Sequence, residues 1–251
     1  MCEKYRVNIN TWNSRFTRLL QADVPVREEH RLFGSGISSR YLADTKKRYW
    51  YKNSQDTGVP EFSILFMIDG SGSMAGSRRN QAVIPSIILH EVLKKQNVPH
   101  AIVEHRGIYN SLRVEHRVLI DFSGREEEKY NLMTLNAFSG TREGLSLYWA
   151  EKYILKHTPH SNRLMIVLSD GVPSHVIKGS GTYEPPVSLR DTAEAAKKII
   201  RRGTDIIAVA LDDGGSSCYD SLCNIYPSVI QCTDLTRLTG QLLGIISRCL
   251  Q

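Results

Sequence analysis

The chain has 251 residues and a net charge of +6, with 41% hydrophobic and 23% charged residues, the composition of a globular protein that can bury a substantial core. Its longest apolar runs span about eight residues, which excludes a membrane-spanning segment. No apolar stretch follows the basic N-terminus to form a signal peptide, so we expect a cytoplasmic protein. The five cysteines include no Cys-x-x-Cys pair, and we interpret them as reduced packing residues.

Residues 1–60 carry most of the positive charge, with eleven Lys and Arg against six Asp and Glu. Such a segment is able to meet nucleic acid or an acidic partner, but no nucleic-acid-binding signature accompanies it, so a solvated extension is the simpler interpretation. The polar stretch at residues 53–60 is typical of a linker. We therefore predict a basic N-terminal extension at 1–60 and one domain at 61–251.

From residue 61 onward, short apolar runs alternate with longer segments of helical periodicity. A capping box at Ser188 and Asp191 predicts the start of one of these helices. The predicted strands are Phe62–Ile68, Ala101–Tyr109, Arg117–Phe122, Arg163–Leu168, Ile206–Leu211 and Val229–Cys232. The predicted helices are 79–96, 142–157, 188–202 and Leu235–Leu250. This alternation predicts an α/β fold: a Rossmann-like, doubly wound, mostly parallel central sheet flanked by helices.

Oxygen-bearing side chains gather where strands of this sheet end. The first strand runs directly into Asp69, followed by Ser71 and Ser73 at alternate positions, and the fourth strand ends at Asp170. Thr141 lies in a loop just before a helix. Ligands of such sheets bind beyond the carboxyl ends of the strands, and an all-oxygen set favours a hard divalent ion. The sequence therefore predicts a Mg²⁺ or Mn²⁺ site.

This pattern resembles the metal-ion-dependent adhesion site, or MIDAS, of von Willebrand factor A (vWA) domains, at Asp69, Ser71, Ser73, Thr141 and Asp170. The resemblance implies that the serines and the threonine bind the cation directly and that the aspartates act mostly through water or as outer acceptors. It also implies an open coordination position that a carboxylate of a protein partner fills. On this interpretation the domain is a non-catalytic binding module.

A narrower resemblance covers residues 34–251. It rests on the segments G-I-S-S-R-Y at 36–41, I-D-G-S-G-S-M, L-S-D-G-V-P and Asp191-Thr192, and on the C-terminal helix. These are similar to the vWA region of the cobaltochelatase accessory subunit and of the nitric oxide reductase activation protein. The resemblance implies a partnership with a MoxR-like AAA+ ATPase that acts on a client metalloenzyme.

The main alternative is a Rossmann-type NAD(P)-dependent oxidoreductase that uses the turn Gly70-x-Gly72-x-x-Ala75. Asp69 would repel a pyrophosphate there, and Thr141 and Asp170 would have no role. The sequence contains no nucleophile elbow of a serine hydrolase and no Gly-Lys-Ser/Thr of a P-loop. It also has Ser71 where an aspartyl phosphotransferase would have a second acid.

We also expect His105 and His116 to form a plain cross-strand pair. We expect the loop 172–186, with His175 and Tyr183, to shape partner selectivity.

Overall fold

The computed structural model describes residues 9–14, 17, 25–55, 62–160, 162–177, 181–211, 217–232 and 235–249. Its centre is a six-stranded sheet with the strand order β11-β10-β7-β4-β5-β6. All neighbouring pairs in it are parallel except β5 and β6, which are antiparallel. The strands are β4 (Phe62–Asp69), β5 (His100–Gly107), β6 (Val114–Ile120), β7 (Asn162–Ser169), β10 (Thr204–Ala210) and β11 (Val229–Gln231). The predicted mostly parallel α/β sheet is confirmed.

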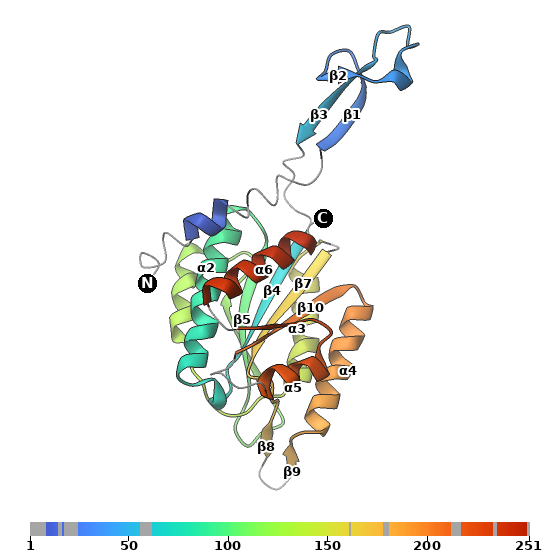
Figure 1. The fold of residues 1–251 in the computed structure, drawn as a ribbon. Coiled ribbons are helices and arrows are strands. Elements are labelled where there is room, and N and C mark those ends of the chain that lie inside the picture. The colour runs from blue at the N-terminus through green and yellow to red at the C-terminus, as the bar shows by residue number, and fades with distance from the viewer. Residues whose placement is uncertain are drawn as a thin grey trace.

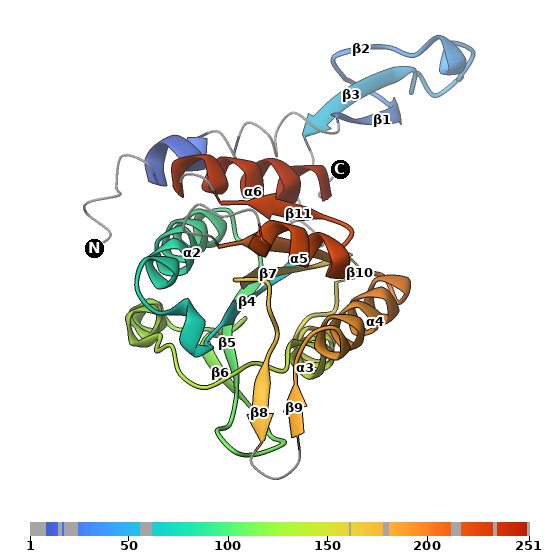
Figure 2. The same ribbon diagram turned by 60° about the horizontal axis from the view of Figure 1, so that its bottom comes forward.

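Helices cover both faces of the sheet (Figures 1 and 2). One face carries α2 (Ser77–Lys95) and α6 (Leu235–Cys249). The other carries α3 (Glu143–His157), α4 (Val187–Arg201) and α5 (Ser217–Ile225). Within the described residues, no helix is both long enough and apolar enough to cross a membrane.

The central strand β4 shows why its sequence is apolar throughout. Ile64, Phe66 and Ile68 belong to the core beneath α2 and α6. Leu65 and Met67 belong to the core beneath α3, α4 and α5. Successive side chains of a strand point to opposite faces, so a strand covered on both sides needs an apolar residue at every position.

The predicted capping box at Ser188 is wrong. Helix α4 begins at Val187, after Pro186, and no side chain caps its N-terminus. Ser188 lies inside the first turn, fully buried, while Asp191 accepts a hydrogen bond from the hydroxyl of Tyr183 at 2.6 Å. The pattern failed because tertiary contacts, which the spacing does not encode, engage Asp191.

Several elements of residues 121–225 are absent from the predicted set. The predicted loop 172–186 contains a short hairpin of β8 (His175–Ile177) and β9 (Gly181–Tyr183). Helix α5 precedes β11, and a 3-10 helix, η4 (Glu126–Thr134), follows β6. These segments are short, and their hydrophobic pattern is too brief to show a period.

The N-terminal region contributes two separate structures. Residues 9–14 are helical, and their Ile9 is buried in the core beneath α2 and α6. Strands β1 (Pro25–Arg31), β2 (Gly36–Ile37) and β3 (Trp50–Gln55) form a three-stranded antiparallel sheet that projects from the rest of the molecule (Figure 1). The predicted boundary at residues 60 and 61 lies outside the described residues.

Candidate metal centre

Asp69 and Asp170 emerge from adjacent strands at the centre of the sheet. Strands β4 and β7 pair in parallel up to Ile68 and Leu168, and Asp69 and Asp170 follow at their carboxyl ends. The hydroxyl of Ser169 lies 3.5 Å from Oδ2 of Asp69 and links the two strand ends. The first and fourth predicted strands are therefore neighbours, and their two aspartates lie at the same edge of the sheet.

The loop between β4 and α2 holds its oxygen atoms close together. The backbone N–H of Ser71 donates to Oδ1 of Asp69 at 2.8 Å. The hydroxyl oxygens of Ser71 and Ser73 are 3.0 Å apart. A 3-10 turn, η3 (Gly72–Met74), follows, and Gly76 adopts a positive φ of 79° directly before α2. The loop thus places the two hydroxyls side by side.

The loop that carries Thr141 is fastened to the serine loop through the backbone. The N–H of Phe138 donates to the carbonyl of Gly70, and the N–H of Gly72 donates to the carbonyl of Ser139, both at 2.8 Å. Thr141 is buried, and its N–H donates to the carbonyl of Ser174 at 2.7 Å. The segments after β4, before α3 and after β7 are therefore joined by main-chain hydrogen bonds.

The hydroxyl of Thr141 has one hydrogen-bond partner among the described side chains, Nδ1 of His105 at 3.4 Å. His105 pairs directly with His116 across β5 and β6, as predicted. Burial lowers the pKa of His105 to about 3, with a smaller contribution from His116. The ring beside Thr141 is therefore neutral at pH 7, and it adds no positive charge to the site.

Buried negative charge accumulates at the site. Asp69 is 2% exposed, and burial raises its pKa well above the usual value, with further contributions from the charges of Asp170 and Glu143. Asp170 accepts from the guanidinium of Arg78 at 3.3 Å through Oδ2. Its other oxygen, Oδ1, is buried and has no hydrogen-bond partner among the described residues.

Glu143 is a member of this cluster that the sequence did not reveal. It stands in the first turn of α3, where a favourable interaction with the helix dipole is sufficient to explain it. The structure buries it completely, and Oε1 accepts from the hydroxyl of Tyr226 at 2.5 Å. Burial raises its pKa to about 7, and the nearby Asp170 contributes in the same direction. Nothing in its sequence spacing distinguishes it from an ordinary helix-start glutamate.

This donor set fits a hard divalent cation. Of the three buried carboxyl groups, Asp170 pairs with the guanidinium of Arg78, and carboxylate oxygens of Asp170 and Glu143 lack partners among the described residues. A cation would satisfy them and offset the charge. The described residues contain no group of three or more His, Cys, Asp or Glu side chains arranged to hold a metal, so hydroxyl groups must supply part of any shell here.

The β8–β9 hairpin packs against the loops that form the candidate site. His175 is buried, and its Nε2–H donates to the carbonyl of Ser111 at 2.8 Å. Its ring lies against Gly107 and Gly140, where an added Cβ would come within 3.0 Å of it. His175 therefore packs the loops together and has almost no surface to offer a partner. Tyr183 is partly exposed and stacks beneath the guanidinium of Arg142.

No protein-family model and no curated protein matches the chain. Solved structures do match, at 11–16% sequence identity. A D319A mutant of the PilB minor pilin of Streptococcus sanguinis aligns with a TM-score of 0.63 and 11% identity over 80% of this chain and 64% of that one. The pilus adhesin SpaC of Lactobacillus rhamnosus GG, in an open conformation, aligns at 0.55 and 16% over 79% and 31%.

A third match is to a single domain. The vWF domain of the type V pili tip protein Mfa5 of Porphyromonas gingivalis aligns with a TM-score of 0.55 and 13% identity, over 77% of this chain and 97% of the domain. At such identities the likeness concerns the fold alone. Together with the sheet order and the two helical layers, it gives the chain a von Willebrand factor A-like fold.

Proposed function

We propose that this protein is a non-catalytic, metal-ion-dependent binding domain that grips an acidic residue of a protein partner. The observation that carries the proposal is that the carboxyl edge of a vWA-like sheet holds two contacting serine hydroxyls and also buried carboxylate oxygens that have no partner among the described residues. Without a cation, this arrangement leaves charge and lone pairs unsatisfied in a buried place, which is costly.

The residues proposed to hold Mg²⁺ or Mn²⁺ are Asp69, Ser71, Ser73, Thr141 and Asp170. Ser71, Ser73 and Thr141 would bind through their hydroxyls, while Asp69, already engaged by the N–H of Ser71, would act from outside the direct shell. A bound ion with few direct carboxylates remains electrophilic and offers a coordination position to a carboxylate of the partner. The partner's acid therefore completes the shell.

The proposed partner is a MoxR-like AAA+ ATPase that acts on a client metalloenzyme, and the proposed location is the cytoplasm. The support for the partner is the motif resemblance described above. SpaC, which shares the fold, is described as an adhesin, and this favours a binding role over a catalytic one for the fold. Pull-down from the native cell should recover a ring ATPase with the chain, and EDTA should abolish the recovery.

The direct test is a calorimetric titration of Mg²⁺ and of Mn²⁺ into the EDTA-treated protein. We expect one site in the wild type and none in Asp69→Ala or Thr141→Val, since valine keeps the shape of threonine without its hydroxyl. The matched control is Thr182→Val, at an exposed threonine of β9. Equal uptake by Thr141→Val and Thr182→Val would remove Thr141 from the proposed site.

The alternative, an NAD(P)-dependent oxidoreductase, predicts nicotinamide dinucleotide binding without metal. The buried carboxylates of Asp69 and Glu104 border the Gly70 turn, where an added Cβ would lie 2.9 Å from Cγ of Glu104. Both acids would repel a pyrophosphate. Fluorescence titration with NADH in the presence of EDTA separates the two proposals.

A further inference from the structure

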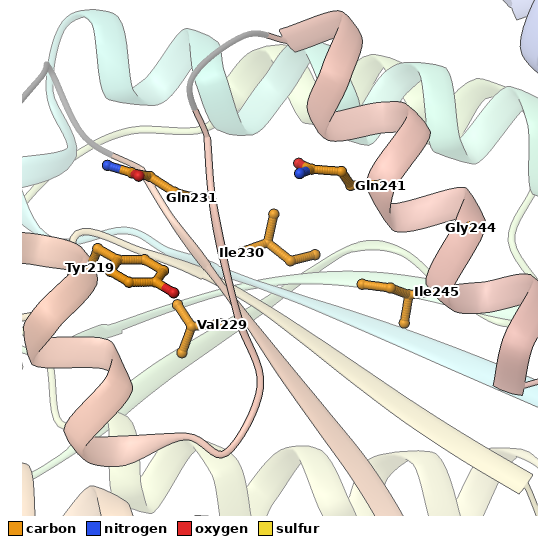
Figure 3. A pocket seen from close by; sticks show the side chains of 7 residues that line it. All are labelled: Tyr219, Val229, Ile230, Gln231, Gln241, Gly244 and Ile245. Carbon is orange, nitrogen blue, oxygen red and sulfur yellow. The ribbon is translucent and has the colours of Figure 1, made fainter.

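A groove of about 710 Å³ opens at the β11 edge of the central sheet (Figure 3). Strand β11 forms its floor, α5 forms one wall through Tyr219, and α6 forms the other through Gln241, Gly244 and Ile245. None of the lining residues is charged. The groove therefore suits an uncharged ligand.

The floor of the groove presents main-chain groups for which the described residues supply no hydrogen-bond partner. Strand β11 ends the sheet, and its only described strand neighbour is β10. The N–H of Ala208 donates to the carbonyl of Ser228, and the N–H of Cys232 donates to the carbonyl of Ala210, both at 3.0 Å. Alternate residues of a parallel strand point to the same neighbour, so Val229 and Gln231 direct their N–H and C=O groups outward.

The opposite edge of the central sheet, formed by β6, is covered. After β6 the chain folds back as η4, which packs along that strand. The side-chain amide of Asn131 in η4 donates to the carbonyl of Leu119 at 3.0 Å. Native sheets generally cover or blunt their edges in this way, and within the central sheet the β11 edge differs from the β6 edge in lacking such a cover among the described residues.

We propose that this groove binds an extended, uncharged segment of a partner protein, which adds as a further strand alongside β11. An extended backbone is the ligand that matches the outward N–H and C=O groups of Val229 and Gln231. A second copy of the chain fits less well, because β11 lies between two helices and two recessed edges cannot approach each other.

The two walls specify the side chains of that segment. Ile230 belongs to the core beneath α6, whereas Val229 packs toward the core beneath α5. Side chains of an added strand would therefore alternate between Ile245 on α6 and Tyr219 on α5. The amides of Gln231 and Gln241 flank the groove and can pair with polar side chains of the segment (Figure 3). The expected ligand carries apolar residues at alternate positions and no charge.

Gly244 allows the groove to be closed without disturbing the fold. A Cβ added there meets no atom within 4 Å. Gly244→Trp should therefore fill the groove, while Gly244→Ala leaves it open and is the matched control, since both replacements also raise helix propensity. Circular dichroism and thermal unfolding of both variants establish that they are folded.

The probe is a phage-displayed library of random heptapeptides, selected on the wild type and counter-selected on Gly244→Trp. We expect uncharged peptides with alternating apolar residues. Binding should weaken about tenfold or more in Gly244→Trp and less than about twofold in Gly244→Ala. Methylation of alternate backbone amides of a selected peptide should weaken binding about fivefold for each hydrogen bond lost. EDTA should have no effect, which separates this site from the metal centre.

Three outcomes would overturn the proposal. The library may fail to yield any peptide that distinguishes the wild type from Gly244→Trp. Selected peptides could tolerate methylation at every backbone amide, in which case they do not add as a strand. Sedimentation could reveal a dimer of the wild type that Gly244→Trp dissociates, and the occupant of the groove would then be a second copy.

Discussion

At the amino-terminal end of the sheet, His90 of α2 and His100 of β5 form a buried pair whose ring nitrogens are 2.8 Å apart. Nδ1 of His100 also lies 2.8 Å from the carbonyl of Val98, so this nitrogen must carry the hydrogen. Nε2 of His100 then accepts from Nδ1–H of His90. Burial lowers the pKa of both rings to about 4, and the pair is neutral at pH 7.

At the carboxyl end, the buried acids of the candidate site raise one another's pKa. The histidine pair fixes its tautomers through internal partners and leaves only Nε2 of His90 without one among the described residues. The acid cluster leaves oxygens of both Asp170 and Glu143 without one. The comparison teaches that the buried polar groups at one end pair mainly with each other, whereas those at the other leave acceptor oxygens of two acids that a bound cation would satisfy.

The largest expected effect concerns Asp69→Asn. Asparagine can still accept from the N–H of Ser71, but it removes one charge from the acid cluster. We expect Mg²⁺ uptake to fall by about 100-fold or more, while the metal-free protein gains on the order of 1 kcal/mol in unfolding free energy. Calorimetry and thermal unfolding with EDTA measure the two effects. If Asp69→Asn retained Mg²⁺ uptake and its metal-free form were less stable than the wild type, the contrast between the two ends of the sheet would be wrong.

The histidine end should make the protein sensitive to acid. The folded pKa values of His90 and His100 are about 4, below the ordinary 6.5, so the unfolded state takes up protons as the pH falls from 6.5 toward 4. Each histidine then lowers the unfolding free energy by about 1.4 kcal/mol per pH unit. Urea unfolding at pH 7, 6 and 5 measures this loss.

Protonation of Glu143 has the opposite effect on stability. Its folded pKa of about 7 lies above the ordinary 4.5, so its contribution to the unfolding free energy grows as the pH falls from 7 to 4.5.

The double variant His90→Gln/His100→Gln isolates the histidine pair. The unfolding free energy of this variant should change less steeply with pH between 6 and 5 than that of the wild type, by up to the contribution of two titrating histidines. An identical slope would show that the pair is not neutral in the folded protein.

A smaller effect is expected at Arg78, the guanidinium beside Asp170. Arg78→Gln removes a positive charge that competes with an incoming cation, and we expect Mg²⁺ affinity to rise about three- to tenfold. Arg79→Gln is the matched control, because Arg79 instead donates to the carbonyl of Met133 at 2.8 Å. Weaker binding in Arg78→Gln would mean that this side chain shapes the site.

The smallest effect is expected for Ser188→Ala. The buried hydroxyl of Ser188 has no hydrogen-bond partner among the described residues, so its loss should change the unfolding free energy by less than about 0.5 kcal/mol or raise it slightly. Thr192→Val, which removes a 2.9 Å hydrogen bond to the carbonyl of Ser188, should cost about 1 kcal/mol. A loss of about 1 kcal/mol in Ser188→Ala would instead fit a helix cap.

Much of the fold was predictable because its signals are local. The continuous apolar run of β4 requires cover on both faces, and the alternation of strands and helices predicts the parallel sheet. The short elements β8, β9 and α5 were missed, since a few residues cannot display a hydrophobic period. The capping box at Ser188 was misread because the hydroxyl of Tyr183, on the preceding strand β9, engages its acid.

The sequence by itself determined the mostly parallel sheet, its two covered faces and the positions of Asp69 and Asp170 at strand ends, because apolar runs and their alternation with helical periods are visible in residue type and spacing. Only the tertiary structure brought Glu143 into the acid cluster, buried His175 and left the β11 edge open between two helices. These depend on contacts between segments distant in sequence, such as Tyr226 with Glu143, and no local pattern encodes such contacts.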